Sequence, residues 1–283
     1  MPNDSSKSPV WFITGCSTGL GRALAERVLQ QGERCVATAR NPAQLEDLAA
    51  AYPHALVLPL DVANGDEIEA AVAKATETFG AIDVLVNNAG RGYSAAIEEG
   101  DDAEVRAMFD TNFFGLIALT KRVLPQMRAR TRGHIVNLSS IGGLVASASA
   151  GYYNATKFAI EGLSQALHVE VAPFGIHVTL VEPGPFRTDF QGRSLTTTKT
   201  PLDAYAATAG ARRAQFKASS GRQAGDPVRA ADAIIKIVRS PKPPLHLLLG
   251  KNALERARAV YADFLLSMDE WENVTLSADF PES

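Results

Sequence analysis

Tyr153 and Lys157 are the first pair in this sequence whose types and spacing could do chemistry. They stand four residues apart in a segment with helical periodicity, so both project from one face of the expected helix, whereas Tyr152 points elsewhere. A tyrosine has a pKa of about 10, and an adjacent cation lowers that pKa by favouring the phenolate. The pair therefore predicts acid–base work at a tyrosine, although a surface pair of the same spacing is the plainer interpretation.

Two serines, Ser139 and Ser140, come at the end of a predicted strand over residues 134–139. The carboxyl ends of parallel strands form the edge where open α/β folds bind ligands. Side chains alternate along a strand, so only one of the two hydroxyls faces such a site, and the strand pattern alone does not say which. We expect one of them to hold a substrate oxygen.

A glycine-rich turn links the first predicted strand, residues 10–14, to a helix. Gly15, Gly19 and Gly21 lack a Cβ, which lets the backbone approach a pyrophosphate at the positive end of that helix. The same turn also matches the G-x-S-x-G pattern of serine hydrolases, with Ser17 as the nucleophile. Most of the five histidines fall within or beside predicted strands or helices rather than in loops, so phosphate binding is the favoured interpretation.

The residue at the end of the second predicted strand, 34–39, bears on the choice of nucleotide. An acidic residue there would bind the ribose 2′-hydroxyl of NAD, whereas an arginine would accept the 2′-phosphate of NADP. The sequence has no acid at this position and has Arg40 instead. We therefore predict NADP(H), with NAD(H) as the alternative; a solvated residue at a strand end is the plainer interpretation of Arg40.

Taken together, these motifs resemble the short-chain dehydrogenase/reductase family over about residues 9–250. The T-G-x-x-x-G-x-G pattern falls at residues 14–21, and N-N-A-G falls at residues 87–90. The resemblance implies a tetrad of asparagine, serine, tyrosine and lysine. Its serine stands thirteen residues before the tyrosine, which selects Ser140, and its asparagine is Asn112, in a segment otherwise expected to be an ordinary helix.

The resemblance also implies a set of cofactor-binding residues and a role for each member of the tetrad. The expected set is Gly15, Ser17, Thr18, Gly19, Leu20, Gly21, Arg40, Asp61, Val62, Asn88, Ala89, Gly90, Tyr153, Lys157, Pro183, Gly184 and Thr188. Some members of the family carry an extra basic residue inside the glycine loop, where this chain has Thr18. No metal ligands are expected.

In the implied mechanism, Ser140 binds the substrate oxygen and Tyr153 gives or takes its proton. Lys157 lowers the pKa of the tyrosine and holds the nicotinamide ribose, and Asn112 keeps a water in a proton relay. The prediction is an NADP(H)-dependent carbonyl reductase or alcohol dehydrogenase, which moves hydride between nicotinamide and a carbonyl or alcohol carbon. The alternatives are a non-catalytic dinucleotide-binding sensor and a serine hydrolase.

The elements that must position these residues are short apolar runs alternating with segments of helical period. The strand candidates are residues 10–14, 34–39, 55–61, 82–87, 134–139, 177–182 and 246–249. Because such continuously apolar strands are buried on both faces, we predict an α/β fold. Its form is a Rossmann-type, doubly wound, seven-stranded parallel sheet with helices on both faces, in a single domain.

That domain is expected to span residues 10–283, after a disordered segment at residues 1–9. A substrate lid is expected around residues 186–226, with a helix at 201–217. A helical extension is expected over residues 251–283, where a helix would cover the pocket or pack on the core.

Composition excludes several classes of protein. The 28 basic and 31 acidic side chains are spread along the chain, which argues against nucleic-acid binding. Cys16 and Cys35 lie in apolar stretches, as in proteins of a reducing compartment. No run of about 18 apolar residues predicts a membrane span. We therefore expect a cytoplasmic protein.

Partners are expected to be limited to a small carbonyl or alcohol substrate and further copies of the chain. Phe186 and Phe190 would suit a bulky apolar substrate but could equally be packing residues. The resemblance implies a homodimer or homotetramer that pairs helices near residues 104–129 and 153–172.

Overall fold

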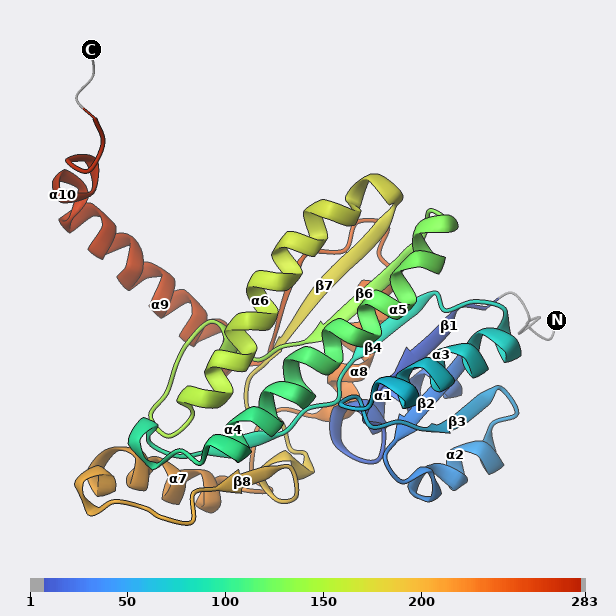
Figure 1. Cartoon of the computed structure of the whole chain (residues 1–283), viewed down its shortest axis with the longest axis horizontal. Helices are drawn as coiled ribbons and strands as arrows, with labels where there is room; N and C mark the ends of the chain where they lie inside the picture. Colours follow the sequence, from blue (N-terminus) through green and yellow to red (C-terminus); the bar gives the residue numbers. More distant parts are fainter. Residues whose placement is uncertain (1–7, 281–283) are drawn as a thin grey trace.

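Seven parallel strands form the central sheet of the computed structural model, which describes residues 8–280 (Figure 1). Their order is β3-β2-β1-β4-β6-β7-β9. Their bounds are β1 Val10–Ile13, β2 Arg34–Ala39, β3 Ala55–Pro59, β4 Val84–Asn87, β6 Gly133–Leu138, β7 Ile176–Pro183 and β9 His246–Leu249. All seven predicted strands are confirmed, and so is the parallel sheet. The order reverses between β1 and β4, which is where doubly wound sheets bind ligands.

Helices cover both faces of the sheet, as predicted. One face packs against α1, α2 and α8, and the other packs against α3, α5 and α6. The helices are α1 Gly19–Gln30, α2 Glu46–Ala51, α3 Gly65–Phe79, α4 Asp102–Phe109, α5 Gly115–Ala129, α6 Gly151–Val171, α7 Ala211–Ser219, α8 Pro227–Val238, α9 Lys251–Glu270 and α10 Glu272–Leu276. The expected Rossmann-type fold in a single domain is therefore correct.

The starts of these helices differ in a way that matters for the site. The side chain of Asn64 accepts hydrogen bonds at the start of α3, and Asp226 does the same at the start of α8. Such caps satisfy the free N–H groups of the first turn. Thr18 stands at the same position before α1 but makes no side-chain cap, and the first turn of α1 contains no acidic residue. The positive end of α1 is thus left to face the glycine loop.

The predicted lid segment is more ordered than expected. Its strand β8 (Leu195–Thr197) pairs in parallel with β5 (Gly92–Ser94), and neither strand was expected from the sequence. The helix expected at 201–217 is broken into three pieces, because a 3-10 turn at Asp203–Tyr205 and a π-helical turn at Ala206–Gly210 precede α7. Other short turns are Pro42–Leu45, Ile97–Glu99, Asp110–Phe114, Ile141–Gly143, Ala172–Phe174 and Asp189–Gln191.

The lid segment is also fastened by one ion pair and by hydrogen bonds. The carboxylate of Glu99, which is fully buried, pairs with Arg213 of α7 at 2.5 Å and accepts from Leu202 N at 2.9 Å. Arg213 holds the pKa of Glu99 down to about 2. Arg91 joins Glu104 of α4 and lies 3.3 Å from Thr196 of β8. These contacts hold the lid against the loop that follows β4.

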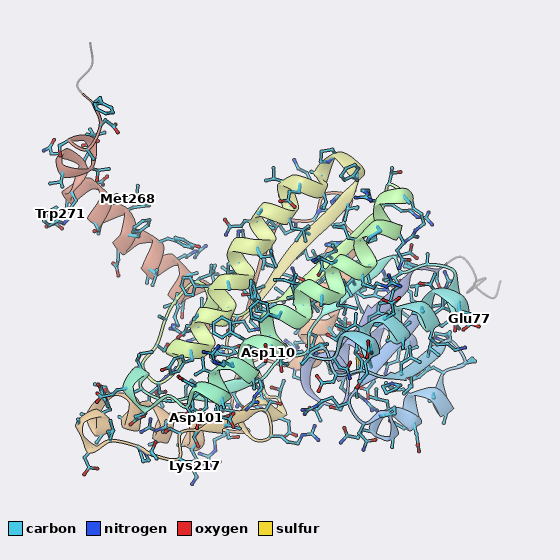
Figure 2. All side chains as sticks on the ribbon, in the orientation of Figure 1. Glu77, Asp101, Asp110, Lys217, Met268 and Trp271 are labelled. Carbon is cyan, nitrogen blue, oxygen red and sulfur yellow. The ribbon has the colours of Figure 1, made fainter. Side chains whose placement is uncertain are left out.

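The C-terminal helix α9 packs on the body only at its start. Ala253 and Ala257 are buried against Ile141 and its neighbours, and the helix then leaves the body (Figure 1). Met268 and Trp271 lie far out along this projection (Figure 2). The expected helix exists, but most of it neither covers a pocket nor packs on the core.

Two expectations concern the chain ends and the membrane. Of the segment 1–9 expected to be disordered, residues 1–7 lie outside the described part of the chain, as do residues 281–283. Within residues 8–280, no helix combines the length and apolar character that a membrane span needs.

Candidate active site

Tyr153 and Ser140 meet at the carboxyl edge of the sheet. Tyr153 lies in the first turn of α6, and Ser140 follows β6. The two side chains are hydrogen-bonded to each other. The hydroxyl of Ser140 also accepts from Gly142 N at 3.0 Å, whereas Ser139 donates to Glu161 on the other side of the strand. Of the two serines left open by the strand pattern, Ser140 is therefore the one beside the tyrosine.

Lys157 lies one turn further along α6, with its Nζ 5.7 Å from the centroid of the Tyr153 ring. Its ammonium donates to Leu138 O at 2.6 Å, and burial lowers its pKa to about 8. Burial raises the pKa of Tyr153 to about 12, with the Ser140 hydrogen bond acting in the opposite direction. Desolvation therefore dominates the pKa of Tyr153 in this structure, and the expected effect of Lys157 on that pKa stays a prediction.

Asn112 is buried in a π-helical turn, Asp110–Phe114, between α4 and α5. Its Oδ1 accepts from Arg91 N at 2.8 Å, and its Nδ2 donates to Arg91 O at 2.9 Å and to Thr156 Oγ1 at 3.1 Å. π-Turns inside helices are frequent at functional sites. Both ends of the amide are thus used to tie the loop after β4 to α6, one residue away from Lys157.

The glycine loop is held in place by the N-N-A-G segment. Asn88 Nδ2 donates to Thr14 O at 2.7 Å and to Gly15 O at 3.1 Å, and Ala89 N donates to Thr14 Oγ1 at 2.9 Å. Gly15 and Gly19 have φ of +69° and +66°, in the left-handed region that favours glycine. A Cβ at Gly21 would lie 2.6 Å from Gly15 O and closer still to Asn88. The free N–H groups at the start of α1 have no side-chain cap and no acidic neighbour in the first turn. The loop and this helix start therefore fit a pyrophosphate group.

The other expected cofactor residues lie in the glycine loop, at or after the carboxyl ends of strands, or in the lid segment. Thr188 of the lid faces Gly19, since a Cβ there would be 3.5 Å from Thr188 Cβ. Asp61 accepts from Ala63 N at 3.0 Å, and Gly184 N donates to Leu249 O at 3.0 Å. Arg40 is exposed just after β2. The remaining members are placed by their elements: Ser17 and Leu20 in the loop and first turn of α1, Val62 after β3, Gly90 after β4 and Pro183 at the end of β7.

Arg193 is a basic residue at this loop that the sequence did not single out. Its Nη2 donates to Thr18 Oγ1 at 3.0 Å across 175 positions of sequence, and its Nε lies 3.4 Å from Asp189 Oδ2. Thr18 occupies the position where some members of the family carry a basic residue. The lid thus brings an arginine to a place where the loop itself has none, and no local sequence signal marks it.

One wall above Tyr153 is apolar. The ring of Phe190 lies 5.7 Å from the Tyr153 ring, and Phe190 and Leu195 both lie close to Gly92. Phe186 plays a different part, because it packs on Gly225 and lines a separate cavity of about 750 Å³ between the lid, α8 and Gly250. Of the two phenylalanines left open by the sequence, only Phe190 contacts the tyrosine.

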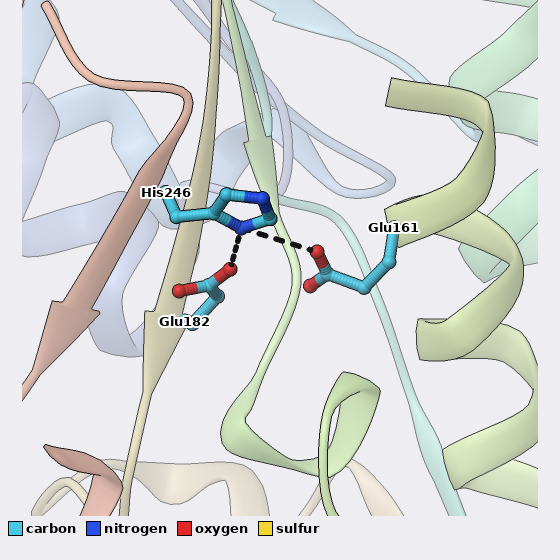
Figure 3. Close-up of side chains that lie close together, drawn as sticks. All are labelled: Glu161, Glu182 and His246. Carbon is cyan, nitrogen blue, oxygen red and sulfur yellow. Dashed lines mark hydrogen bonds and ion pairs between the residues drawn. The ribbon is translucent and has the colours of Figure 1, made fainter. Parts of the chain in front are cut away.

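A second polar cluster consists of Glu161, Glu182 and His246 (Figure 3), and Ser139 donates to its Glu161. His246 Nδ1 is 2.6 Å from Glu182 Oε1 and 3.7 Å from Glu161 Oε2. Burial raises the pKa of each carboxyl to about 7. The three residues come from α6, β7 and β9 and were not predicted as a group.

Sequence comparisons agree with this geometry. A model of the short chain dehydrogenase family matches residues 9–199. The chain is 38% identical to "Oxidoreductase BOA17" of Botryotinia fuckeliana over 95% of this chain and 98% of that protein. It is 37% identical to the 3-ketodihydrosphingosine reductase of Bacteroides thetaiotaomicron over 84% of this chain and 87% of that protein. The chain belongs to the short-chain dehydrogenase family and is an oxidoreductase.

Solved structures give the same result. A short-chain dehydrogenase from Streptomyces avermitilis superposes with a TM-score of 0.91 at 42% identity, covering 96% of this chain and 99% of that one. A 3-ketoacyl-(acyl-carrier-protein) reductase from Brucella melitensis, complexed with NADH, has a TM-score of 0.72 at 26% identity over 87% and 98% of the two chains. A serine dehydrogenase complexed with NADP+ has a TM-score of 0.72 at 27% identity over 85% and 94%.

Proposed function

We propose that this protein is an NADPH-dependent carbonyl reductase whose acid–base residue is Tyr153. The observation that carries the proposal is the hydrogen bond between the half-buried residues Tyr153 and Ser140, with Lys157 one turn away. A phenol with a pKa of about 12 is protonated at neutral pH, so it is ready to donate a proton to a carbonyl oxygen.

The side chains would divide the work as follows. Ser140 and Tyr153 bind the substrate oxygen, and the tyrosine passes its proton to that oxygen as negative charge develops on it. Bound nicotinamide supplies the hydride to the carbonyl carbon. Lys157, cationic at neutral pH, stabilises the phenolate left on Tyr153. Because the side-chain amide of Asn112 is taken up by Arg91 and Thr156, we assign that residue to positioning this set.

The cofactor preference rests on two arginines. Arg40 is exposed at the end of β2, where NAD-dependent sites have an acid. Arg193 adds a second guanidinium at Thr18 of the glycine loop. A 2′-phosphate would gain charge-assisted hydrogen bonds from such groups, whereas a 2′-hydroxyl would gain little. Structures of similar proteins contain either NADH or NADP+, so they do not favour one cofactor. The proposed preference for NADPH therefore depends on Arg40 and Arg193.

The substrate is proposed to be a ketone or aldehyde with an apolar arm. Phe190 lies against the tyrosine ring, and Leu195 lies close to Gly92 together with Phe190. Apolar pockets with a few polar groups are typical of small-molecule sites. One relative is named for the reduction of 3-ketodihydrosphingosine, a ketone. Cys16 and Cys35 are free and buried, which fits action in the reducing cytoplasm.

The test is a screen of NADPH oxidation over aldehydes and ketones, followed by the variant Tyr153→Phe on the best substrate. Loss of the acid should lower kcat by roughly 100-fold to 10,000-fold. Tyr152→Phe is the matched control, because that hydroxyl donates to Ile97 O instead and should leave kcat within a few fold. Near-full turnover by Tyr153→Phe with NADPH still bound would overturn the assignment.

The cofactor preference has its own test. Arg40→Ala and Arg193→Ala should each raise the KM for NADPH several fold and leave the KM for NADH nearly unchanged. An equal effect on both cofactors would mean that the arginines do not read the 2′-phosphate.

A further inference from the structure

Three side chains of types that can ligate a metal ion converge beside Ser139. Glu161 of α6, Glu182 of β7 and His246 of β9 each present one donor atom, and these atoms lie within 4.8 Å of one another. Figure 3 shows the imidazole of His246 with its Nδ1 directed at both carboxylates. Three separate elements therefore supply one compact set of two oxygens and one nitrogen.

The carboxylates in this cluster are only partly satisfied. The side chains of Glu161 and Glu182 are 5% and 0% exposed. Within the described chain, Oε2 of each accepts no hydrogen bond, and Oε2 of Glu161 is the atom that faces His246. Lys157 lies one turn earlier on α6, but its ammonium donates to Leu138 O. Buried carboxylates are costly unless a cation or a proton compensates them.

We propose that Glu161, Glu182 and His246 form a binding site for a divalent transition-metal ion such as Zn²⁺ or Mn²⁺. His246 Nδ1 lies 2.6 Å from Glu182 Oε1 and 3.7 Å from Glu161 Oε2. Two ligand atoms that are each bonded to one metal ion at about 2.1 Å lie roughly 3 Å apart, which is between these two distances. An imidazole with two carboxylates suits zinc or manganese, whereas calcium takes six to eight oxygens. His246 is 42% exposed, so an ion can enter from solvent.

Such an ion would brace the site and take no part in hydride transfer. It would join α6 to β7 and β9 at a point one helical turn beyond Lys157. Glu161 also accepts from Ser139, the neighbour of Ser140. Binding would therefore stabilise the fold and fix the backbone that carries two members of the proposed active site.

The test is calorimetric titration of chelator-treated protein with ZnCl2 and, separately, MnCl2. We expect one saturable site and a rise of a few degrees in melting temperature at an ion concentration about 100-fold above Kd. Glu182→Gln and His246→Gln should each weaken binding at least tenfold. His177→Gln, which removes an exposed histidine from the same strand β7 outside the cluster, should leave binding unchanged.

Two results would overturn the proposal. One is the lack of a saturable site for either ion in folded wild-type protein, in which case a proton compensates the carboxylates. The other is equal affinity in wild type and both cluster variants, which would mean an adventitious surface ion only. Visible absorption of Co²⁺ bound to the wild type reports nitrogen and oxygen ligation directly, so the site can be judged even if a variant fails to fold.

An independent observation concerns the projecting part of α9. Tyr261, Phe264, Leu265, Met268 and Trp271 are between 51% and 62% exposed. Four of them, Tyr261, Phe264, Met268 and Trp271, follow the alternating spacing of three and four residues that forms the seam of a coiled coil. Figure 2 shows Met268 and Trp271 far from the body of the molecule. An apolar seam of this kind is stable only against a partner.

The charges along this helix indicate which partner fits. Its first half carries Lys251, Arg256 and Arg258 with one acidic residue, Glu255, and its second half carries Asp263, Asp269 and Glu270. Two copies laid antiparallel would bring each basic half against an acidic half. An anionic membrane surface would repel the acidic end. We infer that α9 pairs in antiparallel orientation with α9 of a second copy of this chain.

The heptad spacing defines the register of this pair. Phe264 lies opposite Met268 of the partner subunit, and Tyr261 lies opposite Trp271 of the partner subunit. Leu265 flanks the seam at the two-fold axis. Arg258 then lies beside Glu272 of the partner subunit, at the start of α10.

Oxidative cross-linking tests this register. Leu265→Cys should form an intermolecular disulfide, whereas Leu266→Cys, equally exposed but on the opposite side of the helix, should not. Cys16 and Cys35 are fully buried and should stay silent. Phe264→Glu should lower the mass measured by light scattering, and Arg258→Glu should weaken association until Glu272→Arg restores it.

Other outcomes would refute the pairing. Equal cross-linking of both cysteine variants, or an unchanged mass for Phe264→Glu, would exclude α9 as the interface. Flotation of the wild type with vesicles of phosphatidylserine and phosphatidylcholine, lost in Phe264→Glu, would instead assign the seam to a lipid surface.

Discussion

The contact between Gly21 and Asn88 predicts that two glycine-to-alanine substitutions have effects of opposite sign. A methyl group at Gly21 would lie 2.6 Å from Gly15 O and closer to Asn88 Nδ2. Gly162, in the middle of α6, has no heavy atom within 4 Å of the position where its Cβ would lie. Gly21→Ala should therefore displace the glycine loop, whereas Gly162→Ala should fit without any movement.

The expected magnitudes follow from these contacts. Overpacking costs about 1–3 kcal/mol. Displacing Asn88 also loses its hydrogen bonds to Thr14 O and Gly15 O, each worth about 1 kcal/mol net. We expect Gly21→Ala to lower the free energy of unfolding by about 3–5 kcal/mol. Gly162→Ala should raise it by about 0.5–1 kcal/mol, because alanine loses less entropy than glycine on entering a helix.

Urea denaturation followed by the fluorescence of Trp11, which is buried in β1, measures both changes. Titration with NADPH measures whether the loop still approaches the pyrophosphate, and the Kd of Gly21→Ala should rise at least tenfold. The reasoning fails if Gly21→Ala is as stable as the wild type and binds NADPH within twofold of it, or if Gly162→Ala destabilises to the same extent.

Two further predictions concern pH and the lid. Burial lowers the pKa of His134 to about 3, so the unfolded chain alone takes up its proton between about pH 6.5 and pH 3. As the pH is lowered through that window, the free energy of unfolding should fall by up to about 1.4 kcal/mol per pH unit. The difference in the free energy of unfolding between pH 7 and pH 5, measured by denaturation, should be smaller for His134→Gln than for the wild type; an equal difference would contradict this. Glu99→Gln removes the partner of Arg213, so trypsin should cut the lid severalfold faster than in the wild type, and an unchanged rate would show that other contacts hold it.

The central sheet and the main motifs were predictable from the sequence because their signals are local. A short, mostly apolar run such as Cys35–Ala39 predicts a buried strand without any other information. The spacing from Tyr153 to Lys157 is set by one helical turn, and the glycines follow directly on β1. Each of these patterns is complete within a few residues, so no knowledge of distant packing is needed to read it.

The parts that were missed depend on contacts between distant segments. β5 and β8 have three residues each and pair across about 100 positions, so neither shows a readable alternation. Arg193 reaches Thr18, and Glu161 reaches Glu182 and His246, only after the sheet has formed. The π-turn at Asn112 was expected to be ordinary helix, because its sequence lacks a local breaker.

The lid lies over the glycine loop, and this placement has a consequence for the binding of the two ligands. Arg193 contacts Thr18 and Thr188 faces Gly19, while Phe190, between them in sequence, lies against Tyr153. A nucleotide entering the loop must share its site with the same segment that forms the apolar wall for the substrate. Binding of a nucleotide at the loop and binding of a substrate at Tyr153 would therefore be coupled through this segment, and each ligand would change the affinity for the other by the same factor.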